Sequence, residues 1–128
     1  MKSHDLRIGN IVDAIHIDYG RKTNVIDIDD LVLIYEGSEH LSFHPIQLTK
    51  EWLVRFGFDK HGKIKSTKFL FRIYFDEETP YAYLETYGGG EYKIEIKYVH
   101  QLQNLYWGLC GEELTLQNIN SENANKQD

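Results

Sequence analysis

Two residues of this chain are of the types that could act together as a nucleophile and its base. Cys110 is the single cysteine, and His100 lies ten residues before it; a thiol activated by an imidazole is a common covalent catalyst. The apolar periodicity predicts that both lie on one helix, where ten residues span about 15 Å along the axis. That separation is too long for a hydrogen bond, so we interpret Cys110 as a core residue. No other nucleophile, base and orienting group converge in the sequence, and we predict a protein that is not an enzyme.

Two groups of potential metal ligands also have simpler interpretations. Asp27, Asp29 and Asp30 offer carboxylates to a hard cation, but the glycine and the terminal glutamate of a calcium loop are missing. We interpret them as a solvated strand end. His40 and His44 are four residues apart in a segment that alternates like a strand, so helical metal-ligand geometry is not expected. We therefore predict no metal and no cofactor.

The N-terminal part has the pattern of a small β structure. Short apolar segments at regular spacing between residues 6 and 46 predict a small curled sheet or an SH3-like barrel, in which residues 25–28 and 31–35 are strand. Residues 49–57 predict a short helix that fills this sheet, with Thr49 as its N-cap.

The C-terminal part alternates between apolar and polar residues and then changes period. Three alternating segments, 69–75, 81–87 and 92–96, predict a three-stranded antiparallel meander. A helix over residues 98–110 covers its aromatic face, and four polar residues of the helix are expected away from that contact: His100, Gln101, Gln103 and Asn104. The expected fold class is therefore α+β, rich in β structure.

The length of 128 residues fits one domain with a proper core. We predict a single α+β domain over residues 1–116, with a candidate subdomain seam at 59–66. Residues 117–128 hold four Asn, two Gln and one aliphatic residue larger than Ala, which predicts a disordered tail. The sequence leaves open whether the N-terminal sheet and the meander share one core.

Charge and composition narrow the classes of partner. A net charge of −6, from 20 acidic and 14 basic residues, disfavours wholesale binding to nucleic acid. No apolar run approaches the roughly 20 residues that cross a bilayer, so no membrane partner is expected. A single cysteine excludes an intramolecular disulfide, and we expect a reducing cytosolic setting.

Three groups of segments carry a resemblance to a known family. They are LRIGN at 6–10, PIQLTKEWL at 45–53 with FGF at 56–58, and KYVHQLQNLY at 97–106 with GEEL at 111–114. They resemble small uncharacterised proteins of phages, prophages and mobile elements of gut anaerobic bacteria. No activity is established for that family, so the resemblance implies no catalytic residue. It implies a small accessory protein in the cytoplasm of a bacterial host that binds or blocks a host component, such as a host defence.

Three binding hypotheses remain, and we prefer the first. In the first, exposed aromatic and aliphatic side chains dock a host protein; the candidate contacts are Leu70, Tyr74, Leu84 and Trp107. In the second, a pocket holds a nucleotide-like small molecule; the candidate residues are Tyr81, Tyr83, Glu85, Tyr87 and Tyr92. In the third, a basic strip binds nucleic acid; its residues are Lys60, Lys63, Lys65, Lys68 and Arg72. A homo-oligomer is left open.

The pocket hypothesis depends on the strand register around Glu85. On the aromatic face beside Phe71, an ionised Glu85 carboxylate would need a partner, which the tyrosine hydroxyls could supply. A shift of register by one residue would place Glu85 in solvent instead.

Overall fold

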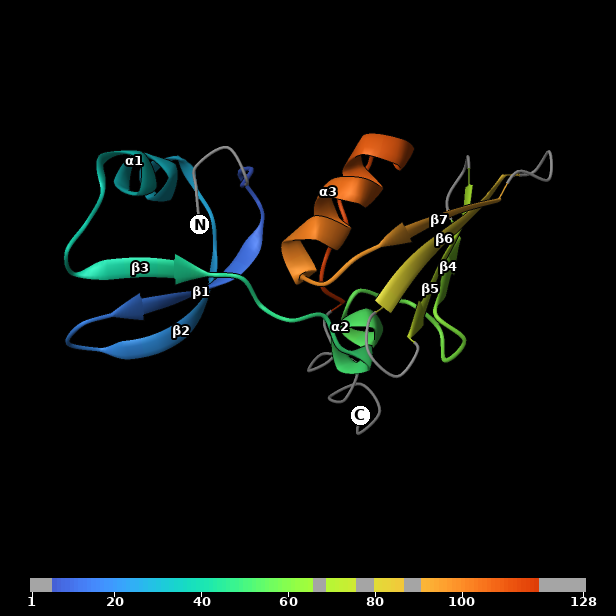
Figure 1. Cartoon of the computed structure of the whole chain (residues 1–128), viewed down its shortest axis with the longest axis horizontal. Helices are drawn as coiled ribbons and strands as arrows, with labels where there is room; N and C mark the ends of the chain where they lie inside the picture. The colour runs from blue at the N-terminus through green and yellow to red at the C-terminus, as the bar shows by residue number, and fades with distance from the viewer. Residues whose placement is uncertain (1–5, 66–68, 76–79, 87–90, 118–128) are drawn as a thin grey trace, which may run out of the picture. The chain divides into compact units, whose positions relative to one another are not determined.

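The computed structural model describes residues 6–65, 69–75, 80–86 and 91–117 (Figure 1). The chain divides into two compact units: the first comprises Met1–Gln47 and Tyr98–Leu105, the second Leu48–Lys97 and Tyr106–Asp128. The candidate seam at 59–66 thus falls inside the second unit, and the single-domain prediction stays a prediction. All but the first residue of the predicted tail lies outside the described residues.

The first unit is built on a three-stranded antiparallel sheet. Its strands are β1 (Ile11–His16), β2 (Gly20–Val25) and β3 (Leu41–His44), in the spatial order β2-β1-β3. A three-residue turn, 17–19, joins β1 to β2 and sets a register in which His16 pairs with Gly20. The expected small sheet is confirmed, whereas an SH3-like barrel is not.

Helix α1 (Ile28–Glu36) contains residues 31–35, which the sequence pattern predicted as strand, and that prediction was wrong. Of the strand predicted at 25–28, Val25 is strand, as the last residue of β2. The cause of the helix is a reciprocal cap at its start. The Asp30 N–H donates to the Asp27 carboxylate at 2.9 Å, and the Asp27 N–H donates to the Asp30 carboxylate at 3.0 Å. These bonds satisfy backbone donors that a helix start leaves open. The aspartates therefore begin a helix and do not end a strand.

The core of the first unit is small and lies between the sheet and α1. Its buried members are Leu6, Val12, Ile26 and Phe43, and four partly buried side chains pack against them: Ala14, Leu31, Ile34 and Leu41. Leu31 and Ile34 are three residues apart on α1, so one narrow side of that helix reaches the core. The rest of α1 is left outside it.

A buried glutamine connects the N-terminal turn of the first unit, residues 7–10, to helix α3 (Val99–Cys110). The Gln103 side chain is 1% exposed. Its oxygen accepts from the Ile11 N–H at 2.8 Å, and its nitrogen donates to the Gly9 carbonyl at 3.0 Å. His100 and Gln103 were expected away from the apolar face of this helix, and both are nevertheless buried. The apolar periodicity identified one buried side of α3 and missed this polar one.

Three further side chains extend this polar network. Asn104 Oδ1 accepts from the side-chain amide of Asn10 at 2.8 Å and from Arg7 Nε at 2.9 Å. Asn10 is fully buried, and its own oxygen accepts from the Arg7 backbone N–H at 2.7 Å. A buried polar group is costly unless it is hydrogen-bonded, so the network fixes one arrangement of the turn against α3.

The second unit begins with a short helix, α2 (Lys50–Arg55), as predicted. The Thr49 hydroxyl caps it by accepting from the Trp52 N–H at 3.4 Å, and Gly57 follows its end with a φ of 94°. That angle lies in the left-handed region, which glycine adopts at little cost. Helix α2 belongs to the second unit and the N-terminal sheet to the first, so the expectation that α2 fills that sheet stays a prediction.

Four antiparallel strands complete the second unit: β4 (Lys63–Lys65), β5 (Phe69–Phe75), β6 (Pro80–Thr86) and β7 (Glu91–Glu95), in that spatial order. The predicted three-stranded meander is confirmed as β5 to β7, and β4 adds a strand to it. Phe71 is fully buried and meets Tyr106 of α3 edge to face, with ring centroids 5.2 Å apart. The C-terminal half of α3 thus packs on the aromatic face of the meander, as the α+β prediction required.

Candidate functional site

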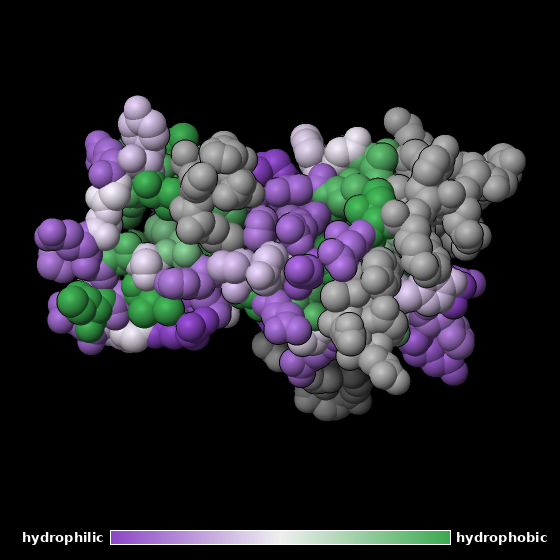
Figure 2. Space-filling model, viewed as in Figure 1, coloured by the Kyte–Doolittle hydropathy of each residue, from purple (hydrophilic) through white to green (hydrophobic). Residues whose placement is uncertain are grey.

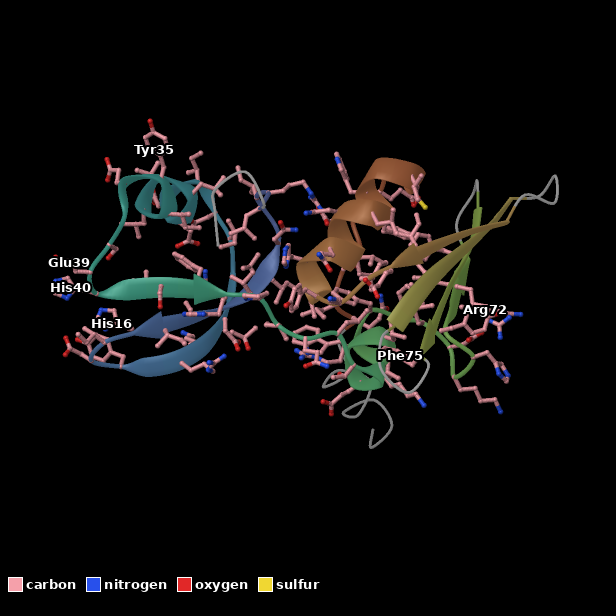
Figure 3. All side chains as sticks on the ribbon, viewed as in Figure 1. His16, Tyr35, Glu39, His40, Arg72 and Phe75 are labelled. Carbon is pink, nitrogen blue, oxygen red and sulfur yellow. The ribbon has the colours of Figure 1, made fainter. Side chains whose placement is uncertain are left out.

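Helix α1 presents apolar side chains to solvent. None of its nine residues is buried. Ile28, Val32 and Tyr35 are spaced by four and three residues, so they lie along one line of the helix; we call them the α1 stripe. Val32 is 46% exposed and Tyr35 82%, and the Tyr35 ring extends away from the helix (Figure 3). Figure 2 shows hydrophobic residues reaching the surface in the part of the molecule that contains β1, β2, β3 and α1.

The surroundings of the α1 stripe are acidic. Between Lys22 and Lys50 the sequence contains no Lys or Arg, and five acids: Asp27, Asp29, Asp30, Glu36 and Glu39. At 3.6 residues per turn, Asp29 and Glu36 follow the stripe directly around the helix surface. The α1 stripe is therefore an apolar strip with a carboxylate border and no cation from its own segment.

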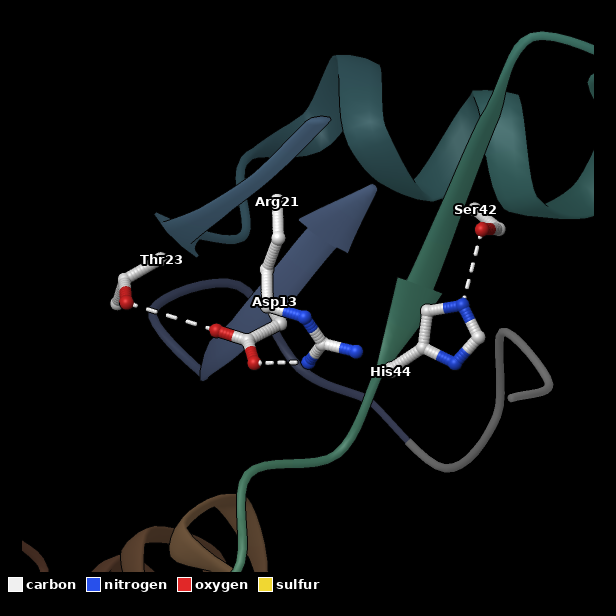
Figure 4. A network of polar contacts seen from close by, with 5 residues as sticks. All are labelled: Asp13, Arg21, Thr23, Ser42 and His44. Atoms are coloured by element: carbon white, nitrogen blue, oxygen red, sulfur yellow. Dashed lines mark hydrogen bonds and ion pairs between the residues drawn. The ribbon is translucent and has the colours of Figure 1, made fainter. Parts of the chain in front are cut away.

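The sheet surface of the same unit differs from α1 because its polar side chains pair with one another (Figure 4). Arg21 forms an ion pair with Asp13, whose other oxygen accepts from the Thr23 hydroxyl at 3.5 Å. Ser42 and His44 share a hydrogen bond of 2.9 Å on β3. Ile8, Ile17, Tyr19 and Val25 of this unit are exposed as well. The feature of α1 is that its three exposed apolar side chains lie along one line of a helix.

A small pocket lies between α1 and β3. It has a volume of about 200 Å³ and is lined by residues of both elements, among them Leu33, Ile34, Leu41 and Phe43. Sites for small molecules typically measure about 300–1,000 Å³. This pocket is below that range, and its size suits one inserted side chain better than a metabolite.

The second unit contains a larger cavity of about 360 Å³. Apolar side chains from α2 and β5 line it together with basic residues at its rim, including Leu53, Ile73, Tyr74, Lys50, Lys60 and His61. The Asp59 carboxylate holds the loop beside it, accepting from the N–H groups of His61 at 2.8 Å and Lys63 at 3.0 Å. The hydrogen bond from the Lys63 N–H is the main reason that the pKa of Asp59 is lowered; desolvation opposes it, and the hydrogen bond from the His61 N–H adds to the lowering. The rim therefore carries basic groups beside a carboxylate that is already engaged.

Of the predicted docking residues, Tyr74 and Trp107 are described in full. Tyr74 is half-buried, and the Arg72 guanidinium lies over its ring at 3.8 Å from the centroid. Trp107 is exposed on α3. For Leu70 and Leu84 the register gives the position: Leu70 pairs with Glu85, whereas Leu84 pairs with Phe71. Neighbouring positions of a strand alternate between the two faces, so these two leucines do not share a face.

The register also divides the predicted pocket residues. Tyr81, Tyr83 and Glu85 alternate along β6, and Glu85 pairs with Leu70 and Glu91. Phe71 pairs with Leu84, so Glu85 is not in the row of Phe71. Tyr92 pairs with Leu84 and thus belongs to the Phe71 row. Tyr87 lies outside the described residues.

In the backbone register Glu85 is thus offset by one residue from the position opposite Phe71, and the pocket hypothesis stays a prediction.

The basic strip is described only in part. Lys63 and Arg72 are paired across β4 and β5, while Lys68 lies outside the described residues. Within the described ranges, no group of three or more His, Cys, Asp or Glu side chains is arranged to hold a metal. No described helix combines the length and apolarity that a bilayer crossing needs.

Sequence reasoning missed the α1 stripe because it assigned residues 25–28 and 31–35 to strand. One available pattern was Asp27 followed three residues later by Asp30, a carboxylate version of the capping box that begins helices. The second was the spacing of Ile28, Leu31, Val32 and Tyr35, which fits a helix as well as a buried strand.

Compared with known protein families, curated proteins and solved structures, the chain matches none of them. The resemblance to proteins of phages and mobile elements stays a prediction.

Proposed function

We propose that this chain is a non-catalytic protein-binding protein that docks its partner through the α1 stripe. The observation that carries the proposal is a nine-residue helix with three exposed apolar side chains in line and no buried residue. Monomeric proteins rarely leave a contiguous apolar patch exposed unless it serves an interaction. Aromatic anchors such as Tyr35 are enriched among the residues that dominate binding energy.

The partner in this proposal is a protein of the bacterial host, and binding blocks it, as an inhibitor of a host defence would. The resemblance to accessory proteins of mobile elements supports this context. Trp107, exposed on α3, is a second candidate contact. Tyr74 is a less suitable anchor than predicted because Arg72 covers its ring.

The test is affinity capture from host lysate with three versions of the tagged chain. The first is the parent. The second, Val32→Asp, places a charge in the middle of the α1 stripe. The third, Val54→Asp, makes the same change at a similarly exposed position of α2 and is the matched control for the α1 stripe. Val54 also lines the cavity of the second unit, so this variant reports in addition whether that cavity contributes to capture. Circular dichroism of each variant checks that the fold is kept.

A host protein retained in fixed ratio by the parent and by Val54→Asp, but lost with Val32→Asp, is the expected result. Equal retention by all three versions would place the contact elsewhere on the chain and would reject the α1 stripe as the docking surface.

A second candidate function is binding of an anionic small molecule in the cavity of the second unit. Its volume of about 360 Å³ falls within the range of small-molecule sites, and Lys50, Lys60 and His61 offer positive charge or hydrogen-bond donors at its rim. The same captured material, heated and analysed for released small molecules, tests this function. A nucleotide released from the parent and lost with Lys60→Glu would support it; release from neither would reject it.

A further inference from the structure

We infer that the partner segment that covers the α1 stripe is a basic amphipathic helix, with apolar side chains facing the stripe and Lys or Arg facing its carboxylate border. This inference rests on the proposed function and names the chemistry of the partner. It depends on two observations together: the apolar line along α1 and the one-sided charge around it.

The dimensions of the α1 stripe match a helical partner. From Ile28 to Tyr35 the stripe covers seven residue steps, or about 10.5 Å along the helix axis. A partner helix presents apolar anchors at positions i, i+3 or i+4, and i+7 over the same length. The stripe can thus be covered by about two turns of a second helix.

The charge around the stripe selects a basic partner. Asp29 and Glu36 border the stripe, and the segment between Lys22 and Lys50 supplies no Lys or Arg to neutralise them. An acidic partner segment would bring like charges together in a contact that excludes water, which costs binding free energy. A basic segment would pair with the same carboxylates and gain in association rate.

The same charge argues against the other occupants of such a surface. A second copy of this chain, packed α1 to α1, would set the five acids of one segment against those of the other. An anionic bilayer and a nucleic acid both carry negative charge and would be repelled likewise. The second copy is tested below by sedimentation.

The experiment uses two synthetic 18-residue helical peptides of opposite charge, one of Leu and Lys and one with Glu in place of every Lys. Each is titrated into the full chain labelled with ¹⁵N and followed by NMR. We expect the Leu/Lys peptide to shift the signals of Ile28, Val32 and Tyr35, and the Leu/Glu peptide to leave them unchanged. Exposed charges are screened by salt, so the affinity of the Leu/Lys peptide should fall as the salt concentration rises from about 50 to about 300 mM.

Variants separate the apolar contribution from the charged one. Val32→Asp should weaken binding of the Leu/Lys peptide by about tenfold or more, because it removes a central contact. Asp29→Asn and Glu36→Gln should each weaken it by about two- to fivefold, the range typical of exposed ion pairs. Val54→Asp on α2 should leave it unchanged.

Three results would overturn the inference. They are equal binding of both peptides, binding that Val32→Asp does not weaken, and no shift at the α1 stripe with either peptide. A dimer in sedimentation that Val32→Asp dissociates would also overturn it, since the occupant would then be a second copy. None of these results decides the proposed function, which stands or falls with the capture comparison of Val32→Asp and Val54→Asp.

Discussion

Helices α1 and α2 begin in the same way and end up in opposite surroundings. Each starts at a residue whose side chain caps its first turn, Asp27 for α1 and Thr49 for α2. Helix α2 is only six residues long and buries Trp52 and Leu53, whereas α1 is nine residues long and buries none. A cap decides where a helix begins, and packing decides whether its side chains stabilise the fold. The apolar residues of α1 contribute little to the core and are therefore available to a partner.

The largest expected effect is a difference in the free energy of unfolding when the same substitution is made in each of the two helices. Leu53 of α2 is 4% exposed and Leu33 of α1 is 37% exposed. Leu53→Ala leaves a cavity in the core and should lower the free energy of unfolding by about 3–5 kcal/mol. Leu33→Ala removes mostly solvated atoms and should lower it by no more than about 1 kcal/mol. Urea denaturation of both variants measures the difference.

The comparison would break if Leu33→Ala cost as much as Leu53→Ala. That result would mean that α1 packs as tightly as α2 in solution, and the α1 stripe would then lose its interpretation as a docking surface.

The second prediction concerns the polar network that supports the unit of α1. Gln103→Ala leaves the Ile11 N–H and the Gly9 carbonyl without their side-chain partner. Burying such groups unpaired should cost about 2–3 kcal/mol in the free energy of unfolding. Gln47→Ala is the matched control, because Gln47 is exposed and should cost less than about 0.5 kcal/mol.

Hydrogen exchange at the Ile11 amide gives a local measurement of the same contact. Protection that survives in Gln103→Ala would show that the turn does not depend on the glutamine.

The third prediction concerns the caps. Because only the partly buried Leu31 and Ile34 pack α1 against the core, loss of its cap should shorten or melt it locally. Asp27→Ala should cost about 1 kcal/mol and reduce the helical chemical shifts of Ile28 and its neighbours. Thr49→Ala removes a longer hydrogen bond, at 3.4 Å, from a helix that the core also holds. Its cost should be smaller, and the helical shifts of α2 should persist. Equal loss of helix in both variants would contradict the view that packing distinguishes the two helices.

Much of the second unit could be predicted from sequence because its elements obey strong local rules. The alternation of Phe71 and Ile73 fixed the buried face of β5, and Thr49 with Gly57 marked both ends of α2. The fourth strand, β4, was not predicted because three residues are too few to establish a period of two.

The first unit was harder to predict because the contacts that determine its fold do not show as a hydrophobic period in the sequence. A run such as Leu31 to Tyr35 fits a buried strand and a helix alike, and a reciprocal hydrogen bond between Asp27 and Asp30 decided between them. Burial of Gln103 depends on a turn more than ninety residues earlier in the chain. The α1 stripe could not be found while its segment was assigned to a strand.

The smallest expected effect is a difference in how the loops that follow the two helices respond to pH. After α1, the Ser38 hydroxyl accepts from the N–H groups of His40 and Leu41, at 3.2 and 3.3 Å. After α2, the Asp59 carboxylate accepts from two backbone N–H groups, and these bonds lower its pKa. A carboxyl whose pKa is lower in the folded chain stabilises the fold above its unfolded pKa, near 3.8, and this contribution is lost as pH falls through the folded value.

Amide exchange at His61 and Lys63, followed below pH 4, should therefore show the loop after α2 loosening on acidification. The Ser38 hydroxyl does not titrate in this range, so it should give the loop after α1 no matching change. In Asp59→Asn the side-chain oxygen can still accept both hydrogen bonds, but the charge is gone. Its loop should be less protected than the parent's at pH 7, and the difference should shrink toward pH 3. A difference that stays constant with pH would mean that the geometry of the side chain, and not its charge, holds the loop beside the cavity.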